Sequence, residues 1–135
     1  MTTNNLPQQN ATTIKTSIME KSERPKIFVT QIPNRRDAAT GAFVPSVNIA
    51  PAAEHGEVVL MMPPQASFHA TSDLVRQLRE HLKHYSYARG DALVALGDPA
   101  IIAVACALLG REFGEFILLK WDRNIGRYLP SHIRV

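Results

Sequence analysis

Residues 91–122, DALVALGDPAIIAVACALLGREFGEFILLKWD, carry the clearest fold signal in the chain. Residues 92–96 form a short apolar run of strand length, and residues 101–109 are apolar with many small side chains. Residues 115–121 are again rich in residues typical of strands. Two apolar strands joined by a helix predict a parallel pair with a right-handed crossover, so this stretch indicates an α/β core.

The turn Gly97-Asp98-Pro99 separates the first of these strands from the helix. Asp is a good N-cap, and Pro suits the first helical position, so a capped strand-to-helix turn is the preferred interpretation. Open α/β sheets also place ligands at the carboxyl ends of their strands, which makes Gly97 and Asp98 candidate ligand-binding residues. The charge of Asp98 and the missing N–H of Pro99 disfavour phosphate. A ligand there would more plausibly offer a hydroxyl or an amine to Asp98.

The rest of the chain extends this core into a single domain. Residues 26–32 and 57–62 are apolar and rich in β-branched side chains, which predicts two further strands. Residues 71–85 carry one apolar stripe at helical period. Residues 127–135 predict a last, antiparallel strand that Pro130 weakens. We therefore expect an α/β fold: a single small domain with a mixed four- to five-stranded sheet, two main helices and a C-terminal β-hairpin.

Two segments fit this domain less well. Residues 1–25 are rich in Thr, Asn and Gln and have no sustained apolar period, so we expect a flexible N-terminal arm ahead of a domain at residues 26–135. The arm is either expendable or a segment that docks on a partner or a neighbouring subunit. Residues 43–49 alternate in hydropathy but contain Pro45, which predicts a sheet edge or a loosely extended connection.

The composition narrows the class of protein. The chain has 135 residues, 45% of them hydrophobic and 20% charged, which is ordinary for a soluble globular protein. Its net charge of +3 is small for an obligate nucleic-acid binder. No segment approaches the ~20 apolar residues of a membrane span. The single cysteine excludes an internal disulfide and suits a reducing compartment. We expect a protein of the cytoplasm, or of a virion if a phage encodes it, with no membrane partner.

No set of residues has the spacing of a catalytic or metal site. Cys106 lies in an apolar run without a cationic neighbour in the sequence, so its thiol should stay protonated and inert. His81 and His84 are three residues apart on the predicted helix, but no HExxH motif or paired cysteines complete a ligand set. A GxSxG elbow is also absent from the sequence. We expect no enzymatic activity, no cofactor and no metal site.

The C-terminal hairpin is the best candidate for binding. It interleaves two aromatic residues, Trp121 and Tyr128, with the basic residues Lys120, Arg123 and Arg127. Aromatic and basic side chains together stack bases and pair with phosphates, so a nucleic acid or a protein partner could contact these residues. Cross-strand packing of Trp121 on Arg127 or Tyr128 explains the same residues without any ligand, and it is the preferred interpretation.

The C-terminal third resembles short proteins encoded by tailed bacteriophages. The resemblance rests on the segment LVALGDP at residues 93–99, on Ala103 and Ala107, and on the segment LLKWDR at residues 118–123. It does not extend to residues 43–64 or to the first 25 residues. It implies a phage origin and carries no activity with it.

The predicted helix after Pro99 is apolar nearly all round, and such a helix is covered on more than one side. One side would face the sheet, and the second cover could be the helix at residues 71–85, the N-terminal arm or a second subunit. Our first hypothesis is therefore a non-enzymatic accessory protein, virion-associated or host-directed, that binds other proteins or forms a homo-oligomer. The first alternative is a nucleic-acid-binding module that uses the hairpin; this partner is not favoured. The second is a small-molecule or nucleotide site at the turn of Gly97 and Asp98.

Overall fold

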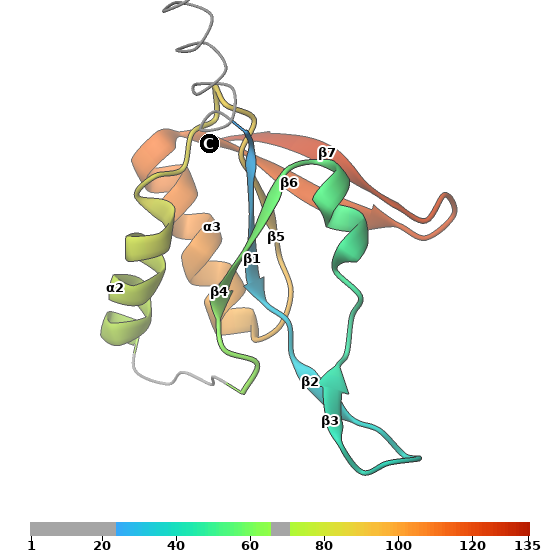
Figure 1. Ribbon diagram of the computed structural model, residues 1–135. Helices are drawn as coiled ribbons and strands as arrows, with labels where there is room; N and C mark the ends of the chain where they lie inside the picture. The colour runs from blue at the N-terminus through green and yellow to red at the C-terminus, as the bar shows by residue number, and fades with distance from the viewer. Residues whose placement is uncertain (1–23, 66–70) are drawn as a thin grey trace, which may run out of the picture.

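A mixed five-stranded sheet with the strand order β4-β1-β5-β6-β7 forms the body of the protein. The computed structural model describes residues 24–65 and 71–135 (Figure 1). The sheet strands are β1 (Lys26–Gln31), β4 (Glu57–Met62), β5 (Ala92–Val94), β6 (Glu115–Asp122) and β7 (Arg127–Arg134). The first four of these are mutually parallel, and β7 pairs antiparallel with β6. The predicted α/β domain with a mixed sheet and a C-terminal hairpin is therefore confirmed.

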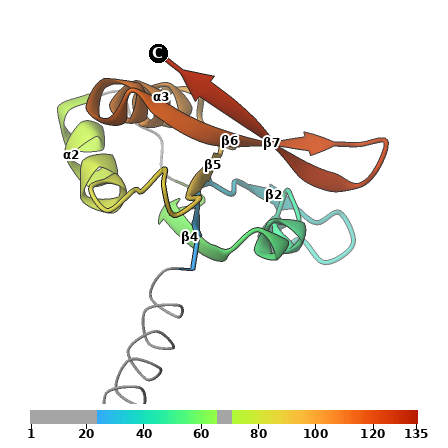
Figure 2. The same ribbon diagram turned by 90° about the horizontal axis from the view of Figure 1, so that it is seen from above.

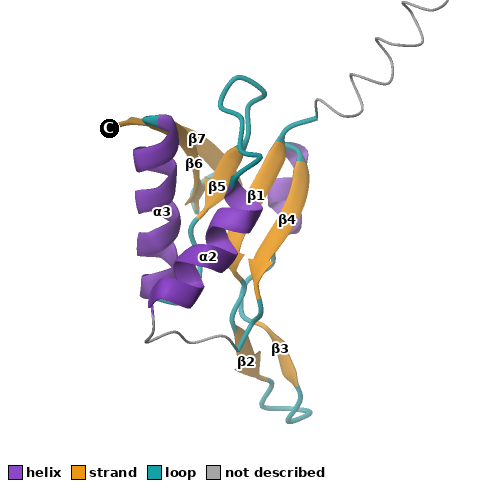
Figure 3. Cartoon of the chain, turned by 90° about the vertical axis from the view of Figure 1, so that its left-hand side faces the viewer, coloured by secondary structure: helices purple, strands orange, loops and turns teal. Residues whose placement is uncertain are grey.

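Two helices, α2 (Thr71–Leu82) and α3 (Pro99–Phe113), lie side by side on one face of the sheet (Figures 1 and 3). Phe28, Leu93 and Phe116 point to this face and pack with buried leucines of both helices. Apolar burial between sheet and helices is the main stabilising contribution in such a layered domain. α2 ends at Leu82, three residues earlier than the apolar stripe predicted.

Among the described residues, the opposite face of the sheet is covered by a short 3-10 helix, η2 (Ala50–Glu54). Ala52 of η2 packs on Ile27 and Val29 of β1, while Leu119 and Tyr128 extend the same apolar cluster over β6 and β7. Seen from above, η2 and the two long helices lie on opposite sides of the sheet (Figure 2). The described residues therefore cover the face with η2 much less than the face with α2 and α3.

The β6–β7 hairpin is much longer than the strand beside it. β6 has eight residues, whereas β5 has three and pairs with β6 only through Ala92 and Leu93. The hairpin therefore runs on past the sheet as an overhang (Figure 1).

A small ribbon of β2 (Asn34–Arg36) and β3 (Phe43–Pro45) forms a second, separate sheet. The sequence placed residues 43–49 at an edge of the main sheet or in a loosely extended connection. Residues 43–45 instead pair with the segment just before them, because a loop at residues 37–42 turns the chain back on itself. The predicted N-terminal arm lies almost entirely outside the described residues.

Candidate functional site

The turn of Gly97 and Asp98 is held by hydrogen bonds on both of its sides. The Asp98 carboxylate accepts a bond of 2.8 Å from the backbone N–H of Ala100, which confirms the predicted N-cap of α3. The backbone N–H of Asp98 donates to Oε1 of Gln31, also at 2.8 Å. The carboxylate and the backbone N–H of Asp98 thus both have hydrogen-bond partners inside the protein.

Gln31 also fills the space beside Gly97. Gly97 has φ +88, and a Cβ added there would lie 2.3 Å from Gln31 Oε1. The Gln31 side-chain amide donates to the carbonyl of Pro63 at 2.9 Å, so it ties the ends of β1 and β4 to this turn. The crevice where α/β sheets place their ligands is packed by this side chain. Ligand binding by Gly97 and Asp98 stays a prediction.

The two aromatic residues of the hairpin face one another across the strands. Trp121 pairs with Tyr128 in the β6–β7 register, and their rings make an edge-to-face contact with centroids 5.0 Å apart. The cross-strand packing that the sequence favoured is therefore confirmed, with Tyr128 as the partner. Tyr128 is only 3% exposed, whereas 49% of Trp121 remains exposed. Trp121 thus presents a large aromatic surface to solvent.

The three basic residues of the hairpin differ in their surroundings. Nε of Arg127 donates to Oε1 of Glu54 at 3.1 Å, so this guanidinium joins the hairpin to η2. Its hydrogen bond and charge lower the pKa of Glu54 below the usual range. Lys120 and Arg123 are exposed and make no ion pair within the part of the chain that the structure describes. Contact of these residues with nucleic acid or a partner stays a prediction.

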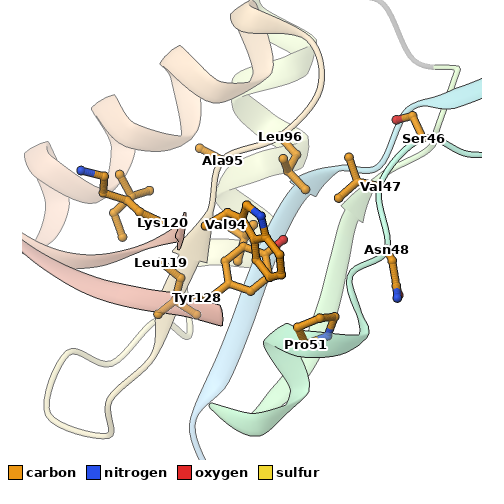
Figure 4. Close-up of a pocket in the computed structure, with 12 residues that line it drawn as sticks. Ser46, Val47, Asn48, Pro51, Val94, Ala95, Leu96, Leu119, Lys120 and Tyr128 are labelled. Atoms are coloured by element: carbon orange, nitrogen blue, oxygen red, sulfur yellow. The ribbon is translucent and has the colours of Figure 1, made fainter. Parts of the chain in front are cut away.

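An apolar pocket of about 700 Å³ opens under the overhanging hairpin (Figure 4). One wall is the loop from Ser46 to Pro51, the floor is the end of β5, and the hairpin supplies the other wall. Figure 4 shows Val47 and Pro51 facing Tyr128, while the Lys120 amine points away. The main apolar lining residues are Val47, Pro51, Val94, Leu96, Leu119, Trp121 and Tyr128.

The Tyr128 hydroxyl supplies a polar atom in this apolar lining. It makes no hydrogen bond to another described residue. Among the described residues, however, every side-chain polar atom that is fully shielded from solvent has a hydrogen-bond partner. The Tyr128 hydroxyl must therefore retain a small solvent-accessible area. Tyr128 is one of the residues that line the pocket. Burial raises the pKa of Tyr128, so the group is a neutral donor and acceptor at physiological pH.

Sequence reasoning found the hairpin side of this pocket but missed the opposite wall. Val47, Asn48 and Pro51 are separated from the hairpin by about seventy positions, and no short motif marks their approach. The available signal was the combination of Pro45 and Pro51, which indicates an extended segment able to lie across a sheet face.

The outward surfaces of the two long helices differ sharply in chemistry. α2 exposes Asp73, Arg76 and Glu80, which is typical of a solvated helix. α3 exposes Ala103 and Ala107, and it has no charged residue before Arg111. Cys106 on α3 is half-buried, and burial raises its thiol pKa, as expected for an inert cysteine.

Residues 24–65 and 71–135 hold no group of three His, Cys, Asp or Glu side chains arranged to bind a metal ion. His132 accepts or donates a hydrogen bond of 3.0 Å with the Tyr87 hydroxyl, and Nε2 of His55 lies 2.9 Å from the backbone oxygen of Tyr128. Among the helices of the described residues, none has the length and apolar character needed to cross a membrane.

Comparison with known proteins gives one match. The family model described as Phage Pam3 gp32-like protein matches residues 25–135. The phage resemblance is thereby confirmed, and it reaches well beyond the C-terminal third, since residues 43–64 lie inside the match. No curated protein and no solved structure matches the chain.

Proposed function

The chain belongs to the Phage Pam3 gp32-like protein family. We propose that it is phage-encoded and that it works without enzymatic activity, by binding other protein surfaces, copies of itself included. The observation that carries this proposal is the outward face of α3 from Pro99 to Gly110, which has no charged residue. The pocket and the half-exposed Trp121 provide a further apolar surface on the other side of the sheet.

The apolar surface of α3 continues onto the C-terminal residue. Val135 is 83% exposed, and a Cβ added to Gly110 would lie 3.1 Å from its side chain. Ala103, Ala107, Gly110 and Val135 therefore form one patch, which we call the α3 patch. Contiguous exposed apolar surface of this kind marks interaction sites on soluble proteins.

The size of the side chains on the α3 patch favours a helix as the partner. Ala and Gly let a second backbone approach closely, within the 8–10 Å that packed helices adopt. The α3 patch of a second copy satisfies this requirement and lets both copies bury the same surface around a two-fold axis. A stable contact needs roughly 800 Å² per partner, so the surrounding half-buried residues must take part.

The buried polar side chains support the non-enzymatic part of the proposal. Asp91 is fully buried and accepts hydrogen bonds from the Arg89 guanidinium and from the backbone N–H groups of Lys26 and Ser86. Thr30 is also buried, and its hydroxyl accepts from the backbone N–H of Leu96 at 2.7 Å. With Gln31, these are the buried polar residues of the described chain, and each one holds strands or loops together.

The proposal is tested by placing a charge in the α3 patch. Ala107→Glu puts a carboxylate on the outward face of α3, one turn before the exposed Arg111. Association would have to desolvate this carboxylate, at a cost of several kcal/mol that a pair with Arg111 does not repay. We expect sedimentation velocity to show a smaller assembly for this variant than for the wild type. Ser72→Glu is the matched control, because it adds the same charge to the exposed first turn of α2 and should associate normally. Equal association of Ala107→Glu and the wild type would contradict the proposal.

A further inference from the structure

The β2–β3 ribbon carries an aromatic side chain that the other described residues leave uncovered. Phe43 is 64% exposed, although it lies in a strand. The ribbon projects from the body in both side views (Figures 1 and 3). A two-stranded ribbon is marginally stable by itself, so a large exposed aromatic on it gains most from a covering partner.

The tip of the ribbon is nevertheless held in a defined shape. The backbone N–H of Asp37 donates to the carbonyl of Ala42 at 2.8 Å, and that of Gly41 donates to the carbonyl of Asp37 at 2.8 Å. The Thr40 hydroxyl donates to the Asp37 carboxylate at 2.9 Å. Phe43 is thus presented by a pre-ordered loop, which lowers the entropy lost when such a side chain binds.

The pocket under the hairpin has the complementary properties. Its volume of about 700 Å³ lies within the usual range for ligand pockets and leaves room for a phenyl ring together with neighbouring backbone. Trp121 and Tyr128 offer aromatic faces and edges for ring stacking. The Tyr128 hydroxyl, which has no hydrogen-bond partner among the described residues, can bond to a backbone group that enters with the ring.

Phe43 of the same chain does not fill this pocket. The loop that forms the pocket wall starts at Ser46, directly after β3, and β3 runs toward the body with Phe43 at its outer end (Figure 1). Three extended residues separate Phe43 from Ser46 by roughly 10 Å. Its 64% exposure agrees with a position away from the pocket.

We propose that the pocket of one copy receives Phe43 from the ribbon of a second copy. Each chain has one ribbon and one pocket on different parts of its surface, so the contact is head-to-tail and builds a closed ring or an open filament. The pocket lies on the face of the sheet that carries η2, opposite the α3 patch. This interface therefore goes beyond the proposed function of the α3 patch and is independent of it.

A complementation experiment tests the head-to-tail contact. Phe43→Ala removes the inserted ring, and Val47→Glu places a charge in the pocket wall. Each substitution is made separately in Ala107→Glu protein, so that the α3 patch does not contribute to association. We expect each variant alone to be a monomer in light scattering. Mixed in equal amounts they should form a two-chain complex and nothing larger, since one supplies a pocket and the other a ribbon.

The single tryptophan gives a second readout of the same mixing. Insertion of Phe43 beside Trp121 should change its emission and saturate at one equivalent. Loss of the Phe43 ring should raise the dissociation constant of the head-to-tail contact at least tenfold, the effect expected for an aromatic side chain at the centre of an interface. Ile125→Ala is the control, because it shortens another exposed apolar side chain, 55% exposed on the hairpin turn, and should leave the complex unchanged.

The outcomes separate this inference from the proposed function. A mixture that stays monomeric, with unchanged Trp121 emission, overturns the head-to-tail contact even if the α3 patch associates. If Ala107→Glu alone leaves association intact and adding Phe43→Ala to it abolishes that association, the ribbon contact stands and the α3 patch fails.

Discussion

Asp98 shows how one side chain stabilises the start of a helix. Its carboxylate accepts the Ala100 N–H, which otherwise has no helical partner. We expect Asp98→Ala to lower the free energy of unfolding by about 1 kcal/mol through loss of this cap. Asp98→Ser, which keeps an acceptor, should retain most of it. Thermal or urea denaturation of the two variants measures the difference; an Ala variant as stable as the wild type would contradict the cap.

Tyr85 predicts a loss of stability at high pH. Its hydroxyl donates to the carbonyl of Asp91 and accepts from the N–H of Ile117, and burial raises its pKa to about 12. An unfolded tyrosine has a pKa of about 10, so between these values the folded state holds the extra proton. Stability is therefore complete below pH 10 and falls as pH rises toward 12, by at most about 2–3 kcal/mol.

Tyr85→Phe provides the control for this alkaline effect. The variant leaves the Asp91 carbonyl and Ile117 N–H without this partner, so it should be less stable at neutral pH by about 1–3 kcal/mol. Its stability should fall less steeply than that of the wild type above pH 10. Urea midpoints from pH 8 to pH 11.5 compare the two proteins, and parallel curves would argue against a buried phenol that titrates.

Among the elements, the β6–β7 hairpin allows a direct choice between packing and nucleic-acid binding. Trp121 packs edge-to-face on Tyr128, and within the described chain only Lys120 and Arg123 of its basic residues are free of ion pairs. We expect single-stranded oligonucleotide to leave Trp121 emission unchanged, and Trp121→Ala to lose about 0.5–1.5 kcal/mol of aromatic pairing plus its buried area. Quenching at low micromolar oligonucleotide that weakens with salt would favour nucleic acid instead.

The elements also differ in how far the sequence predicts them. The β5–α3–β6 unit was predictable because its signals are local: an apolar run, a cap at Asp98 and a Gly114 that ends the helix with φ +77. The β2–β3 ribbon was not, because its strands have three residues each, and the alternation over residues 43–49 does not show which segment they pair with.

The contacts of the candidate site also differ in how far the sequence predicts them. Trp121 and Tyr128 stand in one hairpin, so their pairing follows from the turn between them. The Val47 wall of the pocket and the Gln31 contact with Asp98 join segments far apart in the chain. Such contacts depend on how the sheet twists and packs, which single-sequence patterns do not specify.

At the scale of the whole molecule, the two faces of the sheet offer two different apolar surfaces. On the face that carries α2 and α3, the exposed apolar surface is the α3 patch. The opposite face of the sheet contains the pocket, and the short 3-10 helix η2 is the main element that covers this face. Residues 24–65 and 71–135 leave both surfaces uncovered, and we expect the protein to bury them by association.

The most direct test of this account is the mass of the full chain in solution. Light scattering from low to high micromolar protein should give a mass that rises with concentration to at least twice the 15.0 kDa of one chain. The Ala107→Glu, Phe43→Ala double variant should stay at 15.0 kDa throughout. A wild-type mass of 15.0 kDa at every concentration would contradict the central claim that the protein works by covering these surfaces with copies of itself.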